Sequence, residues 1–572
     1  MYDLVIRGGT VADGTGAPTR TADVAIDGGI VVAVGEVDTP GVREIDADGA
    51  LVTPGWVDIH THYDGQVTWD PQVSPSGWHG VTTVVTGNCG VGFAPVRPGQ
   101  RDFLIGLMEG VEDIPGSALD EGMTWNWESF GDYLDEVERY DRVLDVAALM
   151  PHGALRAYVL GSGRANDVAT DAEIAQMAEL VRDGIAAGAI GVSTTRTLLH
   201  RDRDGELAAG TTAAARELVG LAAGMAGAGH RVFSLASDMA DLDGEFAWMT
   251  ELSRTHGVPV TFQVLDADFA PDAWRQWIER AMIANRQGAW LVPQVPGKPT
   301  SLLVGWDSTF HPFHRYATWQ AIVDLPRPER LARLRDPATR AAMLAEPAPA
   351  TGIEALLVGD LHKLYPLGDP PQYEPPADAS IGAMADRAGV DGRGIAYDLM
   401  CERDGTALLY LPVLGYAGGS LANIAEMLNH PGTVLGLGDG GAHCGLLCDA
   451  SLPTFMLTHW ARDRSRGDTI PVEQVVAHQT SRTAGLYGFG DRGVLAPGFI
   501  ADVNIIDFDN LTLASPEMAW DLPAGGKRLI QRASGYTATV KSGVVVREHD
   551  QATGELPGRL LRGPQHAPLV TA

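Results

Sequence analysis

The sequence predicts an α/β protein: a (β/α)8 TIM barrel with a small β-sandwich domain built from both ends of the chain. Two observations lead to this prediction. Eight short apolar segments alternate with helical segments in the middle of the chain, and strand-like segments separated by turn signals occur near both termini. Continuous apolar strands that alternate with helices favour a parallel sheet covered on both faces, and eight of them favour a barrel. A doubly wound open sheet is the competing architecture.

The eight expected strands are short, and several end at polar residues. They are 56–62, 81–89, 144–152, 189–195, 231–237, 259–266, 289–295 and 433–439. The clearest helix between them begins with a capping box, Thr170-Asp171-Ala172-Glu173, and continues with an apolar stripe at helical spacing. Between the seventh and eighth strands, residues 296–432 are rich in Pro, Arg and Ala. An insertion of this length is expected to form a lid or accessory helices.

The two ends of the chain have the same texture of short strands and turns. The strand-like segments are 4–7, 24–26, 30–34, 501–507 and 537–546. Chain termini that meet are usual for a domain interrupted by a large insertion. We therefore expect residues 1–55 and 481–572 to form the β-sandwich and residues 56–480 to form the barrel domain.

Composition and charge restrict the classes of partner. The chain has 572 residues, 45% of them hydrophobic and 20% charged, and a net charge of −31. This composition is typical of a globular protein with a core. The negative field disfavours nucleic-acid phosphates and anionic membranes. We expect a small-molecule substrate, no nucleic-acid partner and no membrane partner, and we leave a homo-oligomer open.

Targeting signals and cysteine usage point to the cytoplasm. The first residues, Met1 to Ile6, are typical of a strand rather than of a signal peptide. No apolar run reaches the ~18 residues of a membrane span. Four cysteines in a chain of this size are too few for a disulfide framework. The sequence therefore predicts a cytoplasmic protein.

Polar residues with metal-binding chemistry end three of the expected strands. His60-Thr61-His62 ends the first strand, and alternate residues of a strand point the same way, so the two imidazoles form a natural chelate for Zn²⁺ or a similar ion. Asp439 ends the eighth strand, where a carboxylate beside a metal can bind it and accept a proton; an N-cap in a Gly-rich turn is the alternative. Cys89 ends the second strand, as a ligand or as an inert buried thiol.

Other candidates have a weaker basis. His152 ends the third strand, where a hydrogen-bonded structural role and a substrate contact are both open. Ser193 and Arg196, at the end of the fourth strand, are further candidates for substrate binding. His443 follows Asp439 and is a candidate for lining the pocket, whereas the nearby Cys444 and Cys448 are expected to be structural. His311 and His314 lie in the long insertion, where a lid histidine is able to supply a ligand.

Several motifs together resemble a known family. Residues 1–16, the stretch Pro54-Gly55-Trp56-Val57-Asp58-Ile59-His60-Thr61-His62 and the turn Gly438-Asp439-Gly440-Gly441 resemble the metal-dependent amidohydrolase superfamily. Residues 80–90, 152–156 and 553–562 resemble its N-acyl-D-amino-acid deacylase (D-aminoacylase) group. The matches lie in both expected domains and leave most of residues 196–430 uncovered.

The resemblance implies a zinc site held by the first-strand histidine pair, a strand-two cysteine, one histidine each from strands five and six, and the strand-eight aspartate. His60, His62, Cys89 and Asp439 match this pattern. Strands five and six contain no histidine, and Leu235 and Gln263 or its neighbours stand there instead. The first lysine of the chain is Lys298, so a carbamylated strand-four lysine that bridges two metals is excluded. We therefore expect one divalent ion, Zn²⁺, per chain.

The resemblance also implies the reaction. It predicts a metal-dependent hydrolase of an amide (C–N) bond in which Asp439 takes a proton from water and returns it to the leaving nitrogen. A lyase or decarboxylase on the same scaffold, and an inactive structural homologue, are the alternatives, because fold does not dictate reaction.

The resemblance fails at one substrate contact. In the deacylases an arginine shortly after the strand-eight aspartate binds the substrate carboxylate, but residues 448–455 contain no arginine. We therefore expect poor activity on ordinary N-acyl-D-amino acids and a preference for a less charged or larger substrate. The insertion would form much of the pocket wall, with Lys298, Trp306 and Arg315 as candidate contacts. Alternatively, one of these residues or Arg196 replaces the lost arginine.

Overall fold

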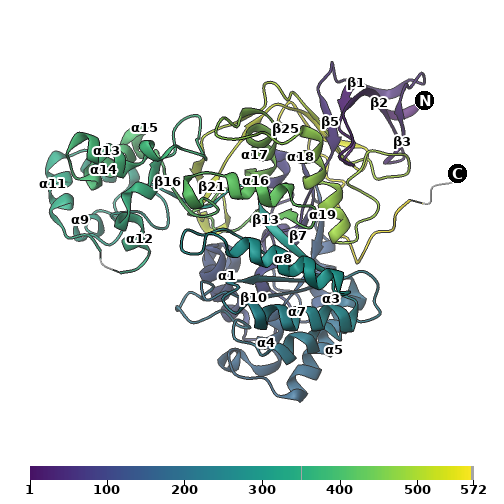
Figure 1. Cartoon of the computed structure of the whole chain (residues 1–572), viewed down its shortest axis with the longest axis horizontal. Helices are drawn as coiled ribbons and strands as arrows, with labels where there is room; N and C mark the ends of the chain where they lie inside the picture. The colour runs from purple at the N-terminus through teal and green to yellow at the C-terminus, as the bar shows by residue number, and fades with distance from the viewer. Residues whose placement is uncertain (350, 569–572) are drawn as a thin grey trace.

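The computed structural model describes residues 1–349 and 351–568. Figure 1 shows three regions: a sheet near the chain termini, a central set of strands surrounded by helices, and a lobe of short helices that projects to one side. The lobe contains the insertion predicted between the seventh and eighth strands. The α/β class predicted from the sequence is confirmed.

All eight predicted strands are present, and their neighbours run parallel. They are β6 (Trp56–Asp58), β7 (Val81–Thr86), β8 (Asp145–Ala148) with β9 (Met150–Pro151), β10 (Gly191–Arg196), β11 (Val232–Ser237), β12 (Val260–Gln263), β13 (Leu291–Pro296) and β17 (Val434–Gly436). One sheet has the order β6-β7-β8 and the other the order β17-β13-β12-β11-β10-β9. The third predicted strand contributes β8 to the first sheet and β9 to the second.

The end of the first strand lies between the second and the eighth. Beyond Asp58, the amide of Thr61 donates to the carbonyl of Val85 (3.1 Å), and the amide of His62 donates to the carbonyl of Gly440 (2.7 Å). Thr61 and Gly440 also form a parallel bridge. These contacts bring the carboxyl ends of the first, second and eighth strands together.

Helices follow most of the parallel strands. They are α1 (Arg101–Glu112), α2 (Gly116–Gly122), α3 (Phe130–Glu138), α4 (His152–Leu160), α5 (Asp171–Ala187), α6 (Ala215–Ala222), α7 (Leu242–His256), α8 (Ala273–Arg286), α17 (Leu452–Phe455), α18 (Val472–Gln479) and α19 (Ser481–Leu486). The capping box predicted for α5 is confirmed, because Thr170 accepts from the amide of Glu173 while the Glu173 side chain accepts from the amide of Thr170.

The two chain ends meet in one nine-stranded sheet. Its strands are β1 (Tyr2–Val11), β2 (Arg20–Asp27), β3 (Ile30–Gly35), β4 (Gly41–Asp46), β5 (Leu51–Pro54), β18 (Val503–Ile506), β23 (Tyr536–Lys541), β24 (Val544–Glu548) and β25 (Gln551–Ala552). The join is the antiparallel pair β5–β18. Side chains of this sheet form a hydrophobic cluster of their own, which includes Ile6, Val52, Val503 and Val540.

The insertion has its own core. It comprises β14 (Thr300–Val304), α9 (Ala317–Gln320), α10 (Arg327–Leu334), α11 (Pro337–Ala345), α12 (Ile353–Gly359), β15 (Tyr365–Pro366), α13 (Ile381–Ala388), α14 (Gly392–Met400), α15 (Glu402–Gly405), β16 (Leu409–Leu414) and α16 (Ala422–Asn429). Its strands form a separate antiparallel sheet. Trp306 stacks on Trp319 within an aromatic cluster of the lobe, with ring centroids 5.3 Å apart. The insertion contains several short helices, and Trp306 is a core residue of the lobe.

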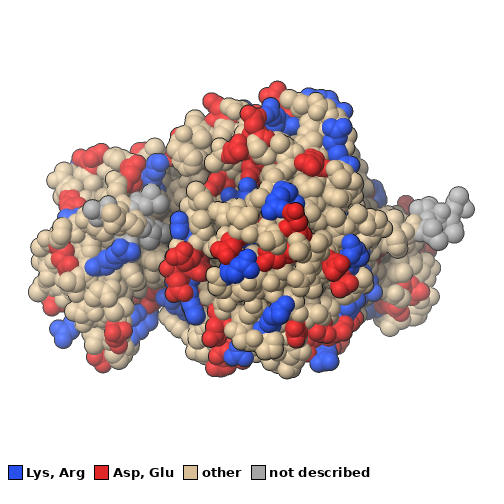
Figure 2. Space-filling model, turned by 90° about the horizontal axis from the view of Figure 1, so that it is seen from below, with Lys and Arg blue, Asp and Glu red and all other residues tan. Residues whose placement is uncertain are grey.

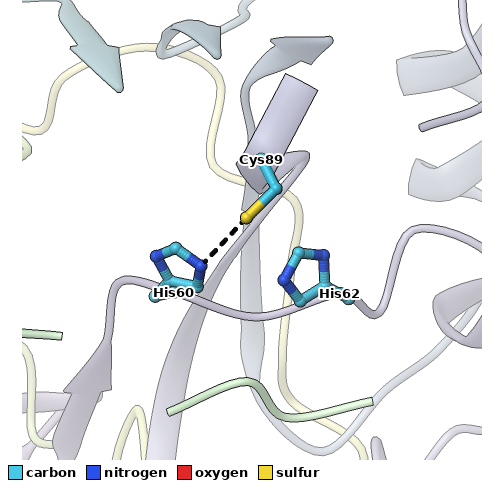
Figure 3. Close-up of side chains that lie close together, drawn as sticks. All are labelled: His60, His62 and Cys89. Carbon is cyan, nitrogen blue, oxygen red and sulfur yellow. Dashed lines mark hydrogen bonds between the residues drawn. The ribbon is translucent and has the colours of Figure 1, made fainter. Parts of the chain in front are cut away.

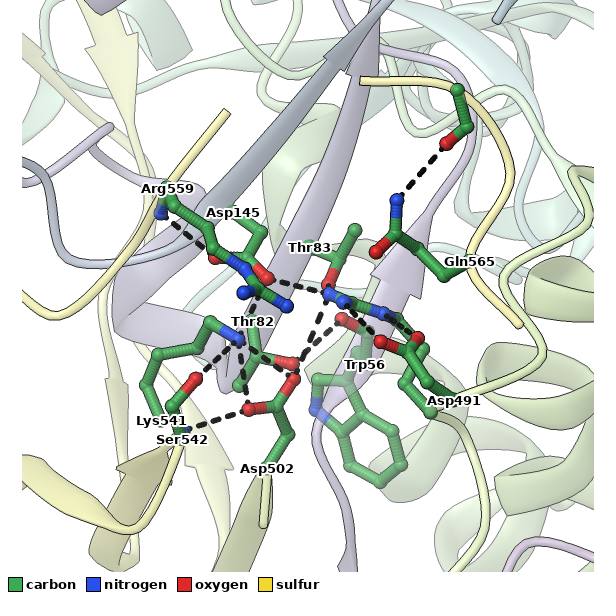
Figure 4. A network of polar contacts seen from close by, with 12 residues as sticks. Trp56, Thr82, Thr83, Asp145, Asp491, Asp502, Lys541, Ser542, Arg559 and Gln565 are labelled. Carbon is green, nitrogen blue, oxygen red and sulfur yellow. Dashed lines mark hydrogen bonds and ion pairs between the residues drawn. The ribbon is translucent and has the colours of Figure 1, made fainter. Parts of the chain in front are cut away.

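Buried charged side chains connect the terminal sheet to the parallel strands (Figure 4). Asp145 of β8 accepts from Arg492 (2.6 Å) and lies 2.9 Å from the ammonium group of Lys541 on β23. Lys541 also donates to Asp502 at 2.9 Å. All four side chains are at most 4% exposed. The network therefore joins three segments that are far apart in the sequence.

One face of the molecule carries both signs of charge. Figure 2 shows acidic and basic side chains interspersed over one face of the molecule. Among the described residues, no helix has the length and apolar character that crossing a membrane requires.

Candidate metal centre

His60, His62 and Cys89 converge in a buried cluster (Figure 3). Each offers one ligand atom, and these atoms all lie within 4.8 Å of one another. The Cys89 sulfur lies 3.5 Å from Nε2 of His60. None of the three residues is more than 5% exposed. The structure therefore brings together three of the four residues that the sequence predicted as metal ligands.

Asp439, the fourth predicted ligand, lies beside both histidines. Its Oδ1 atom is 3.4 Å from Nε2 of His60 and 3.6 Å from Nε2 of His62. The carboxylate is slightly open to solvent, with 17% of the side chain exposed. It is therefore more accessible to solvent than His60, His62 or Cys89.

Strained backbone presents these groups. Leu437, Asp439 and His443 have positive φ angles of 62°, 41° and 51°, in the loop that follows the eighth strand. Cys89 has a φ of 56° in the turn after the second strand. Non-glycine residues adopt this region at an energetic cost, and such residues cluster at functional sites. The concentration of strain around the cluster supports a functional role.

Ser193 supports the turn that carries Cys89. The Ser193 hydroxyl accepts from the amide of Gly90 at 3.0 Å and donates to the carbonyl of Gly87. Ser193 is fully buried on β10. The structure therefore places this predicted substrate-binding residue behind Cys89, as a support for the turn.

The site has unusual electrostatics. Burial lowers the pKa of His60 to about 4, against the opposing charge of Asp439. Burial opposes ionisation of Asp439, but contacts with His62 and His60 outweigh it and hold the carboxyl pKa well below its usual range. Burial favours neutral His62 as well, yet Glu112 and Asp439 raise its pKa well above the ordinary value. Two carboxylates thus create a position that favours a positive charge.

The residues fit a divalent cation. Both ring nitrogens of His62 are buried without a hydrogen-bond partner among the described residues, so this side chain has unused donor and acceptor capacity. Two imidazole nitrogens, a sulfur and a carboxylate oxygen form a donor set that Zn²⁺ prefers. A bound cation would satisfy one of these two nitrogens and would balance the negative charge of the Asp439 carboxylate.

Three side chains that the metal-ligand pattern did not identify, or identified only indirectly, border the cluster. Glu112, at the end of α1, has Oε1 3.4 Å from Nδ1 of His62. Gln294 on β13 has its carbonyl oxygen 3.2 Å from Nδ1 of His60. Gln263 on β12 donates to the Cys89 sulfur at 3.7 Å, so the residue at the sixth-strand position faces the cluster through an amide.

His200 is a further titratable residue near the cluster, and no sequence pattern predicted it. It lies in the loop after β10, where Thr195 contacts its Nδ1 atom at 2.9 Å. Burial lowers its pKa to about 3, with contributions from His443 and His62. Its proximity to the end of the fourth strand was the available signal.

The remaining candidates have structural partners. Nδ1 of His152 lies 2.8 Å from the Thr194 hydroxyl, and Nε2 lies 2.8 Å from Glu217. Arg196 donates to Glu245 at 2.8 Å and to two backbone carbonyls. These two side chains are thus not aimed at the cluster.

His443 lies closer to the site. It is 28% exposed, and its Nε2 atom lies 3.5 Å from Oε2 of Glu112. Its role as a pocket-lining residue stays a prediction.

Comparison with known sequences finds one family whose model covers most of the chain. The model of the Amidohydrolase family matches residues 43–547. A D-aminoacylase of Alcaligenes xylosoxydans xylosoxydans is 37% identical over 194 residues, which cover 34% of this chain and 37% of that relative. An uncharacterized protein of Mycobacterium tuberculosis is 28% identical across 97% of this chain and 93% of its own length.

Solved structures share the fold. A D-aminoacylase structure superposes with a TM-score of 0.64 at 22% identity and covers 98% of this chain and 100% of its own. An N-acyl-D-glutamate deacylase from Bordetella bronchiseptica, complexed with zinc and a phosphonate inhibitor, has a TM-score of 0.65 at 23% identity, with coverage of 98% and 99%. Because the family match spans most of its length, the chain belongs to the amidohydrolase family.

Proposed function

We propose that this protein is a metal-dependent hydrolase of an amide (C–N) bond, similar to D-aminoacylase. The observation that supports it most is the convergence of His60, His62 and Cys89 with Asp439 at 3.4 Å from His60. The D-aminoacylase relative adds support, although its match covers only 37% of that protein.

The proposed roles divide between holding a cation and moving a proton. His60, His62, Cys89 and Asp439 hold one divalent ion, with Zn²⁺ as the expected metal. A bound ion of this kind polarises a substrate carbonyl and lowers the pKa of water. Asp439, ionised and partly open to solvent, accepts the proton of the attacking water and delivers it to the leaving nitrogen.

The number and kind of metal are part of the proposal. Among related structures, one D-aminoacylase is described as having a binuclear centre with activation by one metal and attenuation by a second. The related deacylase from Bordetella bronchiseptica is complexed with zinc. A single cluster of donors in the described part of this chain supports one zinc ion.

The scaffold that we propose is a closed barrel. The eight parallel strands, with the end of the first strand bonded to both the second and the eighth, support a (β/α)8 barrel formed by residues 56–480 with the insertion 296–432. The nine-stranded terminal sheet supports a β-sandwich domain of residues 1–55 and 481–572. In this arrangement the cluster lies at the carboxyl ends of the strands, where barrel active sites occur.

The substrate that we propose has no free carboxylate beside the scissile bond. Cys444, Cys448, Leu452 and Phe455 are all buried after Asp439, where the resemblance places an arginine. Lys298 from the insertion is paired with Asp449 at 2.6 Å. The engaged state of Lys298 and of Arg196 supports a neutral or larger amide.

Product analysis on a panel of amides tests the proposal. Protein reconstituted with zinc is incubated with N-acyl amino acids, their uncharged amides, and cyclic and aryl amides, and products are identified by mass spectrometry. Hydrolysis predicts a carboxylic acid and an amine, with the mass of one water gained, and loss of turnover in a chelator. Release of CO2 or formation of a double bond would instead show a decarboxylase or a lyase. Absence of turnover on all substrates by metal-loaded protein would favour an inactive homologue.

A further inference from the structure

The two first-strand histidines have matching surroundings. Each directs Nε2 toward Asp439, at 3.4 Å from His60 and 3.6 Å from His62. Each directs Nδ1 toward a buried side-chain oxygen from another element: Gln294 for His60 at 3.2 Å and Glu112 for His62 at 3.4 Å. The difference is that Gln294 offers an amide oxygen, whereas Glu112 offers a carboxyl oxygen.

Glu112 is an unusual residue for its position. It is 1% exposed at the end of α1, a helix whose other buried residues are apolar or glycine, such as Leu104 and Met108. A buried carboxylate requires a partner, because desolvation of an unpaired charge is costly. The Oε1 atom of Glu112 has no hydrogen-bond partner among the described residues, and neither has Nδ1 of His62, so the two atoms that face each other are both unsatisfied.

Metal-binding histidines have a general requirement that Glu112 is placed to meet. A histidine that ligates through one nitrogen usually donates its other N–H to a carboxylate, a carbonyl or water, which fixes the tautomer and raises the basicity of the ligating atom. With Glu112 at Nδ1, the Nε2 atom of His62 remains free on the side of Asp439.

The second oxygen of Glu112 points elsewhere. Oε2 lies 3.5 Å from Nε2 of His443, and the backbone carbonyl of Glu112 accepts from the amide of His443. One residue of α1 therefore contacts both a candidate ligand and the loop that carries Asp439. This loop is held in strained backbone at Asp439 and His443, so an additional anchor has a physical purpose.

We propose that Glu112 is a positioning residue for the metal centre: it fixes His62 as an Nε2 ligand and anchors the Asp439 loop through His443. The inference rests on the proposed metal-dependent function but does not depend on which bond is cleaved. Gln294 has the equivalent role for His60, without the charge.

Metal binding, measured separately from catalysis, tests this role. Zinc affinity is determined by competition with a chromophoric chelator for the wild type, Glu112→Gln, Glu112→Leu and the control Glu109→Gln. Glu109 lies one turn earlier on the same helix and is 38% exposed. The expected result is a loss of affinity of about 10- to 100-fold in Glu112→Leu, a smaller loss in Glu112→Gln, and none in Glu109→Gln. Gln keeps an oxygen that accepts from Nδ1, which explains the intermediate value.

The Co²⁺-substituted proteins provide a second readout, because the visible spectrum reports ligand geometry. We expect the Glu112→Leu spectrum to differ from that of the wild type and the Glu109→Gln spectrum to match it. Unchanged zinc affinity and an unchanged spectrum in folded Glu112→Leu would overturn the proposal. Two ions in the wild type and one in Glu112→Gln would also overturn it, because Glu112 would then be a ligand. If the wild type cleaves no amide but Glu112→Leu still binds zinc more weakly than the wild type, this role of Glu112 stands and only the hydrolase is refuted.

Discussion

The Ser193 hydroxyl accepts a hydrogen bond from the amide of Gly90 at 3.0 Å, which fixes the turn of Cys89 against strand β10. The same hydroxyl donates to the carbonyl of Gly87, so one side chain holds the turn on both sides of the cysteine. Cys89 itself has a positive φ of 56°, a conformation that needs support from its surroundings. The position of a candidate ligand thus depends on a side chain more than 100 residues away in the sequence.

Replacement of Ser193 tests this dependence. Ser193→Ala removes both hydrogen bonds without adding volume, so the Cys89 turn should relax and zinc affinity should fall by about 10-fold. Chelator competition measures the affinity, and circular dichroism checks that the fold is retained. Ser237, on the neighbouring strand β11, provides the matched control, and Ser237→Ala should bind zinc as the wild type does. Equal zinc affinity in Ser193→Ala and the wild type would show that the turn does not need this support.

Asp439 has the proposed proton-transfer role. Asp439→Asn removes the base but keeps the shape of the side chain, so kcat should fall by about 10²-fold or more. Thermal unfolding and metal analysis of the same preparation separate loss of chemistry from loss of fold or metal. Near-normal kcat in the variant would transfer the role to another group, with His443 the first to examine.

The buried network of Figure 4 should contribute to the acid stability of the protein. Burial opposes ionisation of Asp145, but Lys541 and Arg492 outweigh it and lower the pKa to about 2. A carboxyl whose pKa is lower in the folded state contributes stability above its unfolded pKa of about 4, and this contribution is lost as the pH falls through about 2. Unfolding monitored by circular dichroism across this range should show the loss.

Asp145→Asn removes the charge at constant shape and leaves two buried cations short of a partner. The free energy of unfolding at neutral pH should fall by about 3–5 kcal/mol, the usual cost of breaking a buried pair on one side. The exposed pair Arg275–Glu426 gives a control, since Glu426→Gln should change stability by less than about 1 kcal/mol. An equally small effect of Asp145→Asn would show that the network adds little.

Lys298 and Arg196 are each paired with a carboxylate, which leads to a prediction about substrates. If no arginine receives a substrate carboxylate, kcat/KM for N-acetyl-D-amino acids should be below that for the matched uncharged amides, by about 100-fold or more, since a buried charge without its partner costs about 3–5 kcal/mol. Steady-state kinetics on matched pairs measures the ratio. Clearly higher kcat/KM for the free acids would restore the deacylase interpretation in full.

Local patterns were sufficient to predict the strands and the convergence of His60, His62 and Cys89. Each of the eight apolar segments contains a strand, although several strands are shorter than predicted, such as β6, which ends at Asp58, and β12, which ends at Gln263. His60 and His62 share one direction through strand alternation, and Cys89 follows a strand that pairs beside theirs. These relationships depend on neighbours in the sequence and on parallel pairing, which sequence patterns record.

Contacts between distant elements were beyond these patterns. Glu112 of α1 lies 3.4 Å from His62, 50 residues earlier in the chain, and Gln294 of the seventh strand lies 3.2 Å from His60. The sequence held one signal: Glu112 continues the apolar stripe of Leu104 and Met108 at helical spacing, where a carboxylate is unexpected. The contact of His152 had no such signal. Its partner Glu217 lies 65 residues away, and no local pattern indicated the pair.

The metal content of the purified protein tests the central claim most directly. The protein is expressed with added zinc, dialysed and analysed by mass spectrometry for metals, beside His60→Ala, Cys89→Ala and the control Cys401→Ala, whose cysteine lies in the insertion. The account predicts one zinc ion per chain in the wild type and in Cys401→Ala, and substantially less than one in His60→Ala and Cys89→Ala. Two ions per chain, no ion in the wild type, or full occupancy in His60→Ala would contradict it.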